Sequence, residues 1–425
     1  MLDLKWVRDN PAAVRDAAER KRITVDVDAF LGIDEKLREV QQVVESMRAD
    51  LKVASKKIGK LSPEEREGAL VEQKAMKATL KEREAEESAL RAEHQALALL
   101  LPMPPAPEVP DGKDDTDNVE LSRVGEPPSF GFDPRSHIEL GEMHGVLDIP
   151  RGVKLAGSRN YLLLGQLARL EQVVLQYAMD HMVGRGFEPV SVPTLVSYAC
   201  MEGTGYFPGG EEQAYMAERD QLALVGTSEV PLTSIHSGEV LDASQLPVRR
   251  VAMSPCYRRE AGTYGKDTKG LYRVHQFWKV EQVVIGPADE AWSTEEHGRM
   301  LAHATDLMDA LELPYRVVNV CTGDLGQGQV QKFDIETWMP SRDNYGETHS
   351  ASRFYDFQSR RLNLRYRPEA GAKPAHCHTL NNTVIASPRV LIALLENHQQ
   401  EDGRVRVPEV LQARFGAEFL GEPTA

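Results

Sequence analysis

The chain has 425 residues, more than one hydrophobic core usually supports, so we expect two domains. Its net charge of −15 argues against binding nucleic acid through the overall field of the protein, because phosphate contacts need local Lys and Arg. The N-terminal sequence lacks the apolar segment of a signal peptide, and no run of about 18 apolar residues occurs, so we expect a cytoplasmic enzyme rather than a secreted or membrane protein.

Residues 1–110 are predicted to be helical, since they contain only two aromatic residues and three glycines. Apolar residues then recur at alternating steps of three and four, which is typical of a coiled-coil seam. The seam consists of Phe30, Ile33, Leu37, Val40, Val44, Met47, Leu51, Ala54 and Ile58.

This first helix is expected to end at Gly59, and a second helix begins with Ser62 as its cap and Pro63 at its first position. The second seam is weaker, because Arg83 and Glu87 occupy positions that its register would make apolar. Residues 1–101 therefore predict an antiparallel helical coiled-coil arm whose tip lies near 56–64.

Four lysines gather at the predicted tip. A coiled coil that serves for oligomerisation is the alternative for such a segment, but a dimer seam gains nothing from like charges at its end. The cluster suits a phosphate backbone that is recognised by shape. It consists of Lys52, Lys56, Lys57 and Lys60.

Residues 102–134 are rich in proline and aspartate and predict a semi-rigid linker. Residues 135–425 are expected to form a second domain of mixed composition. Within it, apolar residues at helical spacing predict a helix over 163–183, followed by a strand over 187–192 that ends before Pro193.

Residues 256–281 predict a β-hairpin that carries phosphate-binding, base-stacking and ammonium-binding groups on one face. By alternation, Tyr272, Val274, Trp278, Val280 and Val284 share one face of its second strand, and Arg273, His275, Phe277, Lys279 and Glu281 share the other. Arg258 and Glu260 have the same parity on the first strand, so the hairpin can bring both over one cleft with Phe277. A charged, solvent-facing hairpin is the alternative.

Two further segments carry polar groups of interest. Thr227 and Glu229 offer a hydroxyl and a carboxylate that could bind a ligand, and a capping threonine beside a solvated glutamate is an equal alternative. Ser387 is expected to cap a helix with Pro388 at its first position. Arg389 in the first turn would oppose the helix dipole, which is acceptable where an anion shares the site.

Cysteines do not indicate a metal or disulfide framework, because Cys200, Cys256, Cys321 and Cys377 are widely spaced. His376, Cys377 and His378 could hold zinc, but no second Cys or His pair completes four ligands at the usual spacing. A strand is the favoured reading of this trio.

The hairpin sequence resembles motif 2 of the class II aminoacyl-tRNA synthetases, with the details of the bacterial-type seryl-tRNA synthetases. The matching residues are Arg258, Glu260, Ala261, Gly262, Asp267, Thr268, Gly270, Arg273, His275, Gln276, Phe277 and Glu281. The helix, strand and proline over 163–193 resemble motif 1, the dimer interface of that class. Residues 378–399 resemble motif 3, and the predicted arm resembles the helical arm with which this family grips tRNA.

The resemblance implies an α+β fold, in which the arm joins a catalytic domain built on an antiparallel β-sheet flanked by helices. It implies ATP-dependent attachment of L-serine to serine tRNA through a seryl-adenylate, with release of AMP and diphosphate. It also implies a homodimer and Mg²⁺, and it leaves selenocysteine tRNA open as a second substrate.

The resemblance also implies the site residues. The catalytic residues that it implies are Arg258, Glu260 and Arg389. ATP binding falls to Arg258, Arg259, Glu260, Val274, Phe277, Glu347, Thr348, His349, Ser350 and Arg389, with Mg²⁺ held by Glu347 and Ser350. Serine binding falls to Thr227, Ser228, Glu229, Arg258, Glu281 and Thr383, and tRNA binding to Lys52, Lys56, Lys57 and Lys60.

Motif 3 departs from the usual family form at Asn382, Thr383, Val384, Ser387 and Pro388, although Thr383 keeps a hydroxyl. Two other functions are considered. One is a ligase that loads amino acids onto a carrier protein, which the arm with its basic tip disfavours. The other is a non-catalytic RNA-binding relative, which the retained Arg258, Phe277 and Arg389 disfavour.

Overall fold

The structure, a computed structural model, describes residues 1–59, 61–262 and 269–423. Lys60 of the predicted basic tip, and Asp267 and Thr268 of the hairpin motif, lie outside the described residues. The chain divides into two compact units, Met1–Pro104 and Pro105–Ala425. Each unit has its own hydrophobic core.

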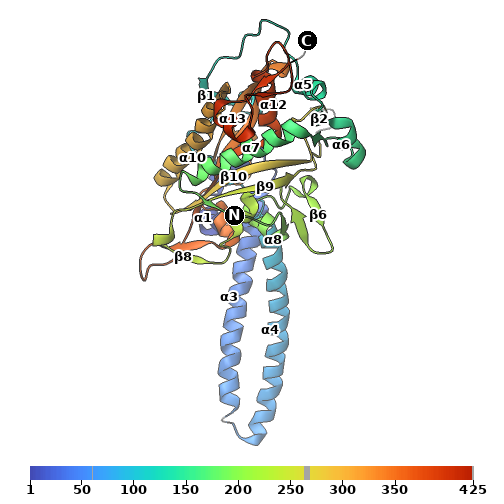
Figure 1. Cartoon of the computed structure of the whole chain (residues 1–425). Helices are drawn as coiled ribbons and strands as arrows, with labels where there is room; N and C mark the ends of the chain where they lie inside the picture. The colour runs from blue at the N-terminus through green and yellow to red at the C-terminus, as the bar shows by residue number, and fades with distance from the viewer. Residues whose placement is uncertain (60, 263–268, 424–425) are drawn as a thin grey trace. The chain divides into compact units, whose positions relative to one another are not determined.

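The first unit is entirely helical in its described part, with α1 (Leu4–Asp9), α2 (Pro11–Arg20), α3 (Val27–Ile58) and α4 (Pro63–Ala98). The two long helices lie side by side along their length (Figure 1). All nine predicted seam residues of α3 are buried or half-buried, and the pair of long helices agrees with the predicted helical arm. Apolar side chains from α1, α2, the start of α3 and the end of α4 pack into a small hydrophobic core around Phe30 and Leu101, at the end of the arm opposite its tip.

The seam of α4 differs from the prediction at one position. Arg83 is exposed, and Glu84 lies in the seam instead, where its carboxylate accepts Arg48 Nη2 at 2.8 Å. A step of four residues from Leu80 reaches Glu84, and the next half-buried residues are Glu87 and Leu90. The seam therefore tolerates acidic residues because a basic residue of α3 faces one of them.

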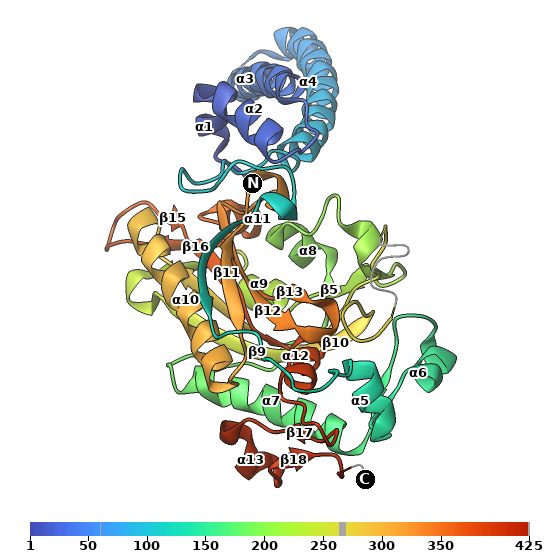
Figure 2. The same cartoon turned by 90° about the horizontal axis from the view of Figure 1, so that it is seen from above.

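The second unit is built on an eight-stranded sheet in the order β1-β11-β12-β13-β16-β10-β9-β4 (Figure 2). Every neighbouring pair is antiparallel except β4 and β9. In that order the strands are Val119–Val124, Tyr315–Asn319, Gln331–Met339, Asn344–Arg353, His378–Ala386, Gln276–Gly286, Val248–Tyr257 and Glu188–Pro189. The predicted antiparallel sheet is thus confirmed.

Three helices pack against this sheet and share its main core: α7 (Gly165–Val183), α10 (Glu290–Ala310) and α12 (Ser387–Asn397). The predicted helix over 163–183 corresponds to α7. The strand predicted over 187–192 is limited to Glu188–Pro189, which pairs only with β9 at the sheet edge. Proline at this edge costs no ladder hydrogen bond, because the strand has no second neighbour.

The proline-rich segment 102–134 is more structured than a linker. Its residues Val119–Val124 form β1, which pairs with β11. Ala106 and Val109 are buried against Val318 and Val320. The apolar residues between the prolines anchor this segment to the second unit. The spacing of the prolines, on which the linker prediction rested, carries no information about this packing.

Smaller elements surround the sheet. The helices are α5 (His137–Met143), α6 (Ile149–Ala156), α8 (Tyr198–Thr204), α9 (Glu229–Ser234), α11 (Phe357–Leu362) and α13 (Glu409–Phe415). The strands are β2 (Leu147–Asp148), β3 (Leu162–Leu163), β5 (Leu195–Ser197), β6 (Tyr215–Ala217), β7 (Leu222–Leu224), β8 (Val240–Asp242), β14 (Arg365–Arg367), β15 (Ala375–His376), β17 (Val405–Arg406) and β18 (Phe419–Leu420). Among the described residues, no helix has the length and hydropathy needed to span a bilayer.

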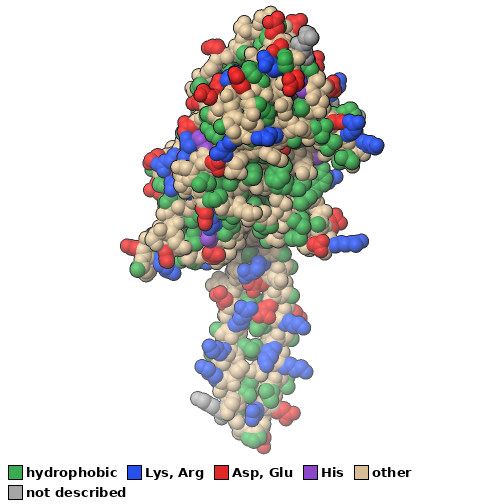
Figure 3. Space-filling view, viewed as in Figure 1, with side chains coloured by type: hydrophobic (Ala, Val, Ile, Leu, Met, Phe, Trp, Pro, Cys, Tyr) green, Lys and Arg blue, Asp and Glu red, His purple; other side chains and the backbone are tan. Residues whose placement is uncertain are grey.

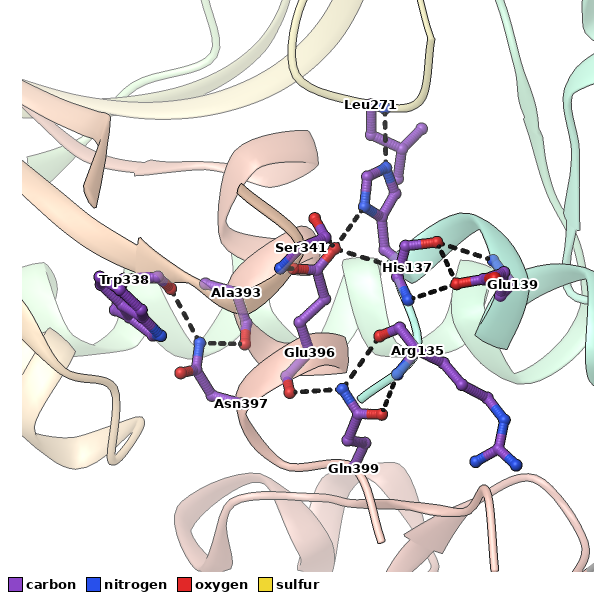
Figure 4. A network of polar contacts seen from close by, with 11 residues as sticks. Arg135, His137, Glu139, Leu271, Trp338, Ser341, Ala393, Glu396, Asn397 and Gln399 are labelled. Atoms are coloured by element: carbon purple, nitrogen blue, oxygen red, sulfur yellow. Dashed lines mark hydrogen bonds and ion pairs between the residues drawn. The ribbon is translucent and has the colours of Figure 1, made fainter. Parts of the chain in front are cut away.

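A buried carboxylate ties α12 to its surroundings (Figure 4). Glu396 Oε1 accepts the backbone N–H of His137 at 2.9 Å and lies 2.7 Å from its Nδ1, while Ser341 donates from both its N–H and its hydroxyl. His137 Nε2 in turn accepts the backbone N–H of Leu271 at 3.2 Å, so Nδ1 carries the proton toward Glu396. Leu271 lies just before β10, and the network therefore fixes the segment that leads into this strand.

Candidate active site

A pocket opens where β10, β13, β16 and α12 meet the segment before β10. Nine residues predicted from the sequence line it, together with six others. The nine are Arg258, Glu260, Val274, Phe277, Glu347, Thr348, His349, Thr383 and Arg389. The others are Leu271, Tyr272, Arg273, Lys279, Ala386 and Pro388.

Arg258 and Phe277 form the stacking wall of the pocket. The β9–β10 register places Gln276 opposite Tyr257, and Arg258 N–H donates to the carbonyl of His275 at 2.9 Å. The guanidinium of Arg258 then lies 5.2 Å from the centre of the Phe277 ring. Such a pair offers a cation and an aromatic face to a nucleotide.

Glu260 lies beyond the end of β9, with a left-handed φ of 52°. Its carboxylate accepts Arg273 Nη1 at 3.0 Å. Arg259, by contrast, is exposed and donates its backbone N–H to Gln213 O at 2.9 Å. The structure therefore places Glu260, but not Arg259, in the pocket wall.

The predicted alternation is wrong at the start of the second strand. Strand β10 begins at Gln276, so Tyr272 and Val274 lie in the preceding segment and line the same pocket as Phe277. Trp278, expected to pack, is 37% exposed. Tyr272 and Val274 depart from the alternation because they precede the sheet ladder, whereas Trp278 belongs to the ladder opposite Pro255 and its exposure is not explained in this way.

Arg389 approaches the pocket from the first turn of α12. It donates to the backbone carbonyl of Glu347 at 2.7 Å and to its carboxylate at 3.2 Å, and it stacks on Tyr272 at 4.5 Å. Ser387 does not cap this helix as predicted: its hydroxyl donates to Glu171 Oε1 at 2.7 Å instead. The cation at the helix N-terminus is thus balanced by a carboxylate of β13.

A β-bulge brings Glu347 and Ser350 to one face of β13. Ile335 pairs with His349 and Glu336 with Glu347, so Thr348 is an extra residue that shifts the alternation. Three residues of separation would otherwise put Glu347 and Ser350 on opposite faces. The bulge is a feature that the spacing in the sequence did not reveal.

Acidic and basic groups surround this face. Asp334 lies opposite Ser350, and Lys332 Nζ lies 3.4 Å from its carboxylate. Burial raises the pKa of Asp334 to about 7, against the opposing effect of Lys332. Burial would also raise the pKa of Glu347, but the neighbouring Arg389 and Lys332 outweigh it and lower that pKa.

The chemistry of the residues on this face suits Mg²⁺. Glu347 and Ser350 offer oxygen ligands on one face, and Oδ1 of the buried Asp334 beside them has no hydrogen-bond partner among the residues that the structure describes. The described part of the chain holds no group of three or more His, Cys, Asp or Glu arranged around a common metal position. The set fits a hard cation that takes its remaining ligands from water and phosphate.

Thr348 and His349 line the pocket, but their polar atoms are engaged within the protein. His349 Nε2 donates to Val384 O at 3.0 Å, and its Nδ1 lies 2.8 Å from Thr348 Oγ1. Burial lowers the pKa of His349 to about 4, so the ring is neutral near pH 7. These side chains hold β13 against β16 at the pocket wall.

A buried polar cluster adjoins the pocket around Glu229. Its carboxylate accepts Tyr206 Oη at 2.9 Å and Gln358 Nε2 at 2.7 Å. Burial, followed by the charge of Glu281, raises its pKa to about 7. Glu229 is therefore not the solvated side chain of the alternative reading, although Thr227 Oγ1 does accept the N–H of Glu229 at 3.1 Å.

Glu281, Thr383 and Lys279 link this cluster to the pocket. Glu281 forms an ion pair with Lys279, and Thr383 Oγ1 donates to Glu281 Oε2 at 3.4 Å. Ser228, also predicted to bind, is buried with its hydroxyl 2.6 Å from Ser254 Oγ. Thr383 and Lys279 line the pocket, whereas Glu281 and Glu229 lie behind its wall.

Sequence reasoning missed several residues of the site. Tyr206 and Gln358 hold Glu229 but are 23 and 129 residues from it in the chain. The segments that contain them, 201–208 and 356–361, also resemble the seryl-tRNA synthetase family, and this resemblance is the signal that could have pointed to them. Lys279 was predicted to share a face with Phe277 and Glu281, and it does line the pocket, but the sequence analysis gave it no role.

On the arm, Lys52, Lys56 and Lys57 are exposed near the end of α3. Both basic and acidic side chains lie on the visible face of the two long helices in Figure 3. Both lysines of the last turn, Lys56 and Lys57, also lie near the helix C-terminus, where cations are favourable. The exposed lysines are available for contact with a phosphate backbone.

The chain was compared with known proteins. Residues 1–105 match the family described as the seryl-tRNA synthetase N-terminal domain, and residues 214–398 match the tRNA synthetase class II core domain of the G, H, P, S and T type. A serine–tRNA ligase of Deinococcus radiodurans is 48% identical over the full length of both chains.

Two solved structures are similar over nearly their whole length. The seryl-tRNA synthetase of Pyrococcus horikoshii, complexed with ATP, aligns with a TM-score of 0.92 and 37% identity over all of both chains. The cytoplasmic serine–tRNA ligase of Naegleria fowleri, in complex with AMP, aligns with a TM-score of 0.84 and 30% identity over 97% of this chain and 96% of that one.

Proposed function

This chain belongs to the seryl-tRNA synthetase family and aminoacylates tRNA with serine using ATP, and we propose that it does so through a seryl-adenylate. The observation that carries the proposal is that a nucleotide subsite and an amino-acid subsite lie next to each other. Arg258, Phe277 and Arg389 line the pocket proposed for the nucleotide. Thr383 lines the same pocket and donates a hydrogen bond to Glu281, which is proposed to bind serine. The products would be AMP, diphosphate and seryl-tRNA.

In the first step the carboxylate of serine attacks the α-phosphorus of ATP as diphosphate leaves. Phe277 would stack on adenine with Val274 at its border, Arg258 would hold the α-phosphate, and Arg389 would hold the terminal phosphates. Glu260, anchored by Arg273, would complete the nucleotide side. No covalent enzyme intermediate is needed, so the rate depends on positioning and charge.

Mg²⁺ would be held by Glu347 and Ser350 and would neutralise charge on the β- and γ-phosphates. ATP would have to draw Arg389 from Glu347 toward its phosphates, because the two side chains are paired in the structure. This exchange of partners would free the Glu347 carboxylate at the moment the nucleotide enters.

Serine would bind through its ammonium and hydroxyl groups. Glu229 and Glu281 supply carboxylates, and Thr227 and Thr383 supply hydroxyls. A site of buried polar groups rejects an apolar analogue strongly, since its own groups would be left without partners. Threonine would be excluded by size.

The second step needs a tRNA, and the arm is the element proposed to hold it. The exposed Lys52, Lys56 and Lys57 would contact the phosphate backbone, with Lys60 as a fourth predicted contact. Serine tRNA is the proposed substrate, and selenocysteine tRNA is a second one to test. We further propose a cytoplasmic homodimer, in which the segment that resembles motif 1, residues 163–193, would contribute to the interface.

The test is charging of purified serine tRNA, selenocysteine tRNA and a carrier protein with labelled serine and ATP. Charging of serine tRNA with matching release of AMP supports the proposal. Labelled carrier protein without labelled tRNA would favour the carrier ligase. No product with any acceptor would favour the non-catalytic RNA-binding protein.

A further inference from the structure

Three side chains at the back of the pocket form a closed triangle of polar contacts. Lys279 Nζ pairs with Glu281 Oε2 and donates to Thr383 Oγ1 at 3.4 Å. Thr383 Oγ1 donates to Glu281 Oε2, also at 3.4 Å. All three residues are at most 6% exposed, so water does not compete freely for these contacts.

Strand pairing explains why the three groups meet. Lys279 and Glu281 are two residues apart on β10 and therefore share a face. A register shift after Val280 places Glu281 directly opposite Thr383 on β16. Without this shift the residue opposite Glu281 would be Val384, and the hydroxyl would lie on the other face.

The chemistry of the triangle fixes the direction of each hydrogen bond. An ammonium has only donors, and a carboxylate that is paired with it has only acceptors. Thr383 must therefore accept from Lys279 and direct its single proton to Glu281. The remaining lone pair of Thr383 Oγ1 can only accept a hydrogen bond. A substrate hydroxyl that reaches Thr383 therefore has to donate one.

We propose that Lys279 is a specificity-determining residue, which orients the Thr383 hydroxyl so that the site selects an amino acid whose side chain donates a hydrogen bond. This inference rests on the proposed function, because it concerns recognition of the serine side chain. Lys279 acts through Thr383 and Glu281 and is a positioning residue rather than a catalytic one. Alanine has no donor at this place and would leave the lone pair of Thr383 without a partner.

Charge compensation is the competing explanation for Lys279. Glu229 and Glu281 are two buried carboxylates close enough to influence each other, and the ammonium of Lys279 offsets both. Loss of compensation alone would weaken serine and alanine binding by the same factor, since both amino acids carry the same ammonium and carboxylate. A change in the direction of the Thr383 hydroxyl would weaken the binding of serine, which carries a hydroxyl, and would leave the binding of alanine unchanged.

The experiment compares two stable adenylate analogues, seryl- and alanyl-sulfamoyl adenosine, which differ by one hydroxyl. Their Kd values are measured by titration calorimetry for the full chain and for Lys279→Met, Lys279→Gln and Lys279→Arg. We expect the seryl-over-alanyl preference to fall about tenfold in the Met and Gln variants, the scale of one hydrogen bond. The Arg variant keeps a donor-only cation and should keep the preference within about threefold.

Two further variants separate the explanations. Lys332→Met removes a half-buried lysine that is paired with Asp334 instead of Glu281, and it should leave the preference unchanged. Thr383→Val combined with Lys279→Gln should lower the preference no more than Thr383→Val alone, because both act on one hydroxyl.

An unchanged preference in Lys279→Gln, or additive effects in the double variant, would overturn the inference. If Lys279→Met does not fold, the Gln and Arg variants decide the question alone. Serine-dependent exchange of pyrophosphate into ATP by the unmodified chain is measured in parallel. Its absence would contradict the proposed function, whereas exchange together with an unchanged preference would contradict only the role of Lys279.

Discussion

Arg389 on α12 and Glu347 on β13 are joined by an ion pair of 3.2 Å, although 42 residues separate them in the chain. The pair lies in the pocket wall beside Arg258. It keeps a cation at the N-terminus of α12, where the helix dipole opposes it. In the proposed function the phosphates of ATP would take over this cation, and the pair would then lie at the centre of the ATP site.

Glu347→Gln should impair the use of Mg²⁺ rather than the binding of serine. The amide keeps the shape but loses the charge that holds a hard cation. We expect serine-dependent exchange to fall about 100-fold, with a higher Mg²⁺ concentration needed for half-maximal rate. The measurement is the rate as a function of Mg²⁺ at saturating serine. An unaltered Mg²⁺ requirement would remove Glu347 from the metal site.

Serine activation should decline as the pH falls through about 7, because burial and Glu281 raise the pKa of Glu229 to about 7 and only its ionised form attracts an ammonium. Tyr206→Phe removes a hydrogen bond that lowers this pKa, so the acid limb of kcat/KM should move to higher pH. A pH profile of exchange checks this. If the acid limb of kcat/KM lay at the same pH in the full chain and in Tyr206→Phe, a group other than Glu229 would be responsible for it.

The raised pKa of Glu229 also predicts a pH dependence of stability. An unfolded glutamate ionises near pH 4.5, whereas Glu229 in the folded chain ionises near 7. The folded chain binds more protons between these values, so the contribution of Glu229 to stability falls as the pH rises through this window. Glu229→Gln should reduce that dependence in urea unfolding curves measured from pH 5 to 8. An unchanged dependence would contradict a protonated Glu229 at low pH.

Glu396→Ala should destabilise the second unit by about 3 kcal/mol, because it removes a buried carboxylate and leaves the buried donors of His137, together with the donors of the exposed Ser341, without their acceptor. Glu295→Ala is a matched control on a helix, since its pair with Arg299 is exposed and should change stability by less than about 0.5 kcal/mol. Urea unfolding of both variants provides the measurement. Equal midpoints for the two would contradict the role of this network.

The outer part of the arm should be needed for tRNA charging and not for serine activation. Deleting residues 42–86 and joining the helices by a short glycine linker retains the basal core around Phe30 and Leu101. Charging of serine tRNA should be lost, while exchange of pyrophosphate remains within about threefold of the full chain. Loss of both activities would show that the arm serves the catalytic unit as well.

Local periodicity predicted the elements whose residues contact neighbours in a regular way. The α3 seam is an example, because each step from Phe30 to Ile58 repeats one geometric relationship. The same rule failed for Tyr272 and Val274, which precede the first ladder position of β10. A different rule, the preference for serine as a helix cap, failed for Ser387, whose hydroxyl donates to Glu171 and not to its own helix.

The site was predictable only as a set of residues, not as a geometry. Family resemblance supplied Glu347 and Ser350, but the bulge at Thr348 that puts them on one face depends on pairing with β12. Glu229 could be named from its motif, yet its raised pKa results from burial among residues far away in the chain. Such contacts form only when distant segments pack.

The most direct test is serine-dependent exchange of pyrophosphate into ATP, measured for the full chain and for Arg258→Ala, with alanine, threonine and glycine as competing amino acids. The account predicts exchange with serine alone and a loss of about 1000-fold in the variant, since Arg258 is assigned to the α-phosphate. Exchange with no amino acid, or equal exchange in Arg258→Ala, would contradict the assignment of this pocket to serine activation.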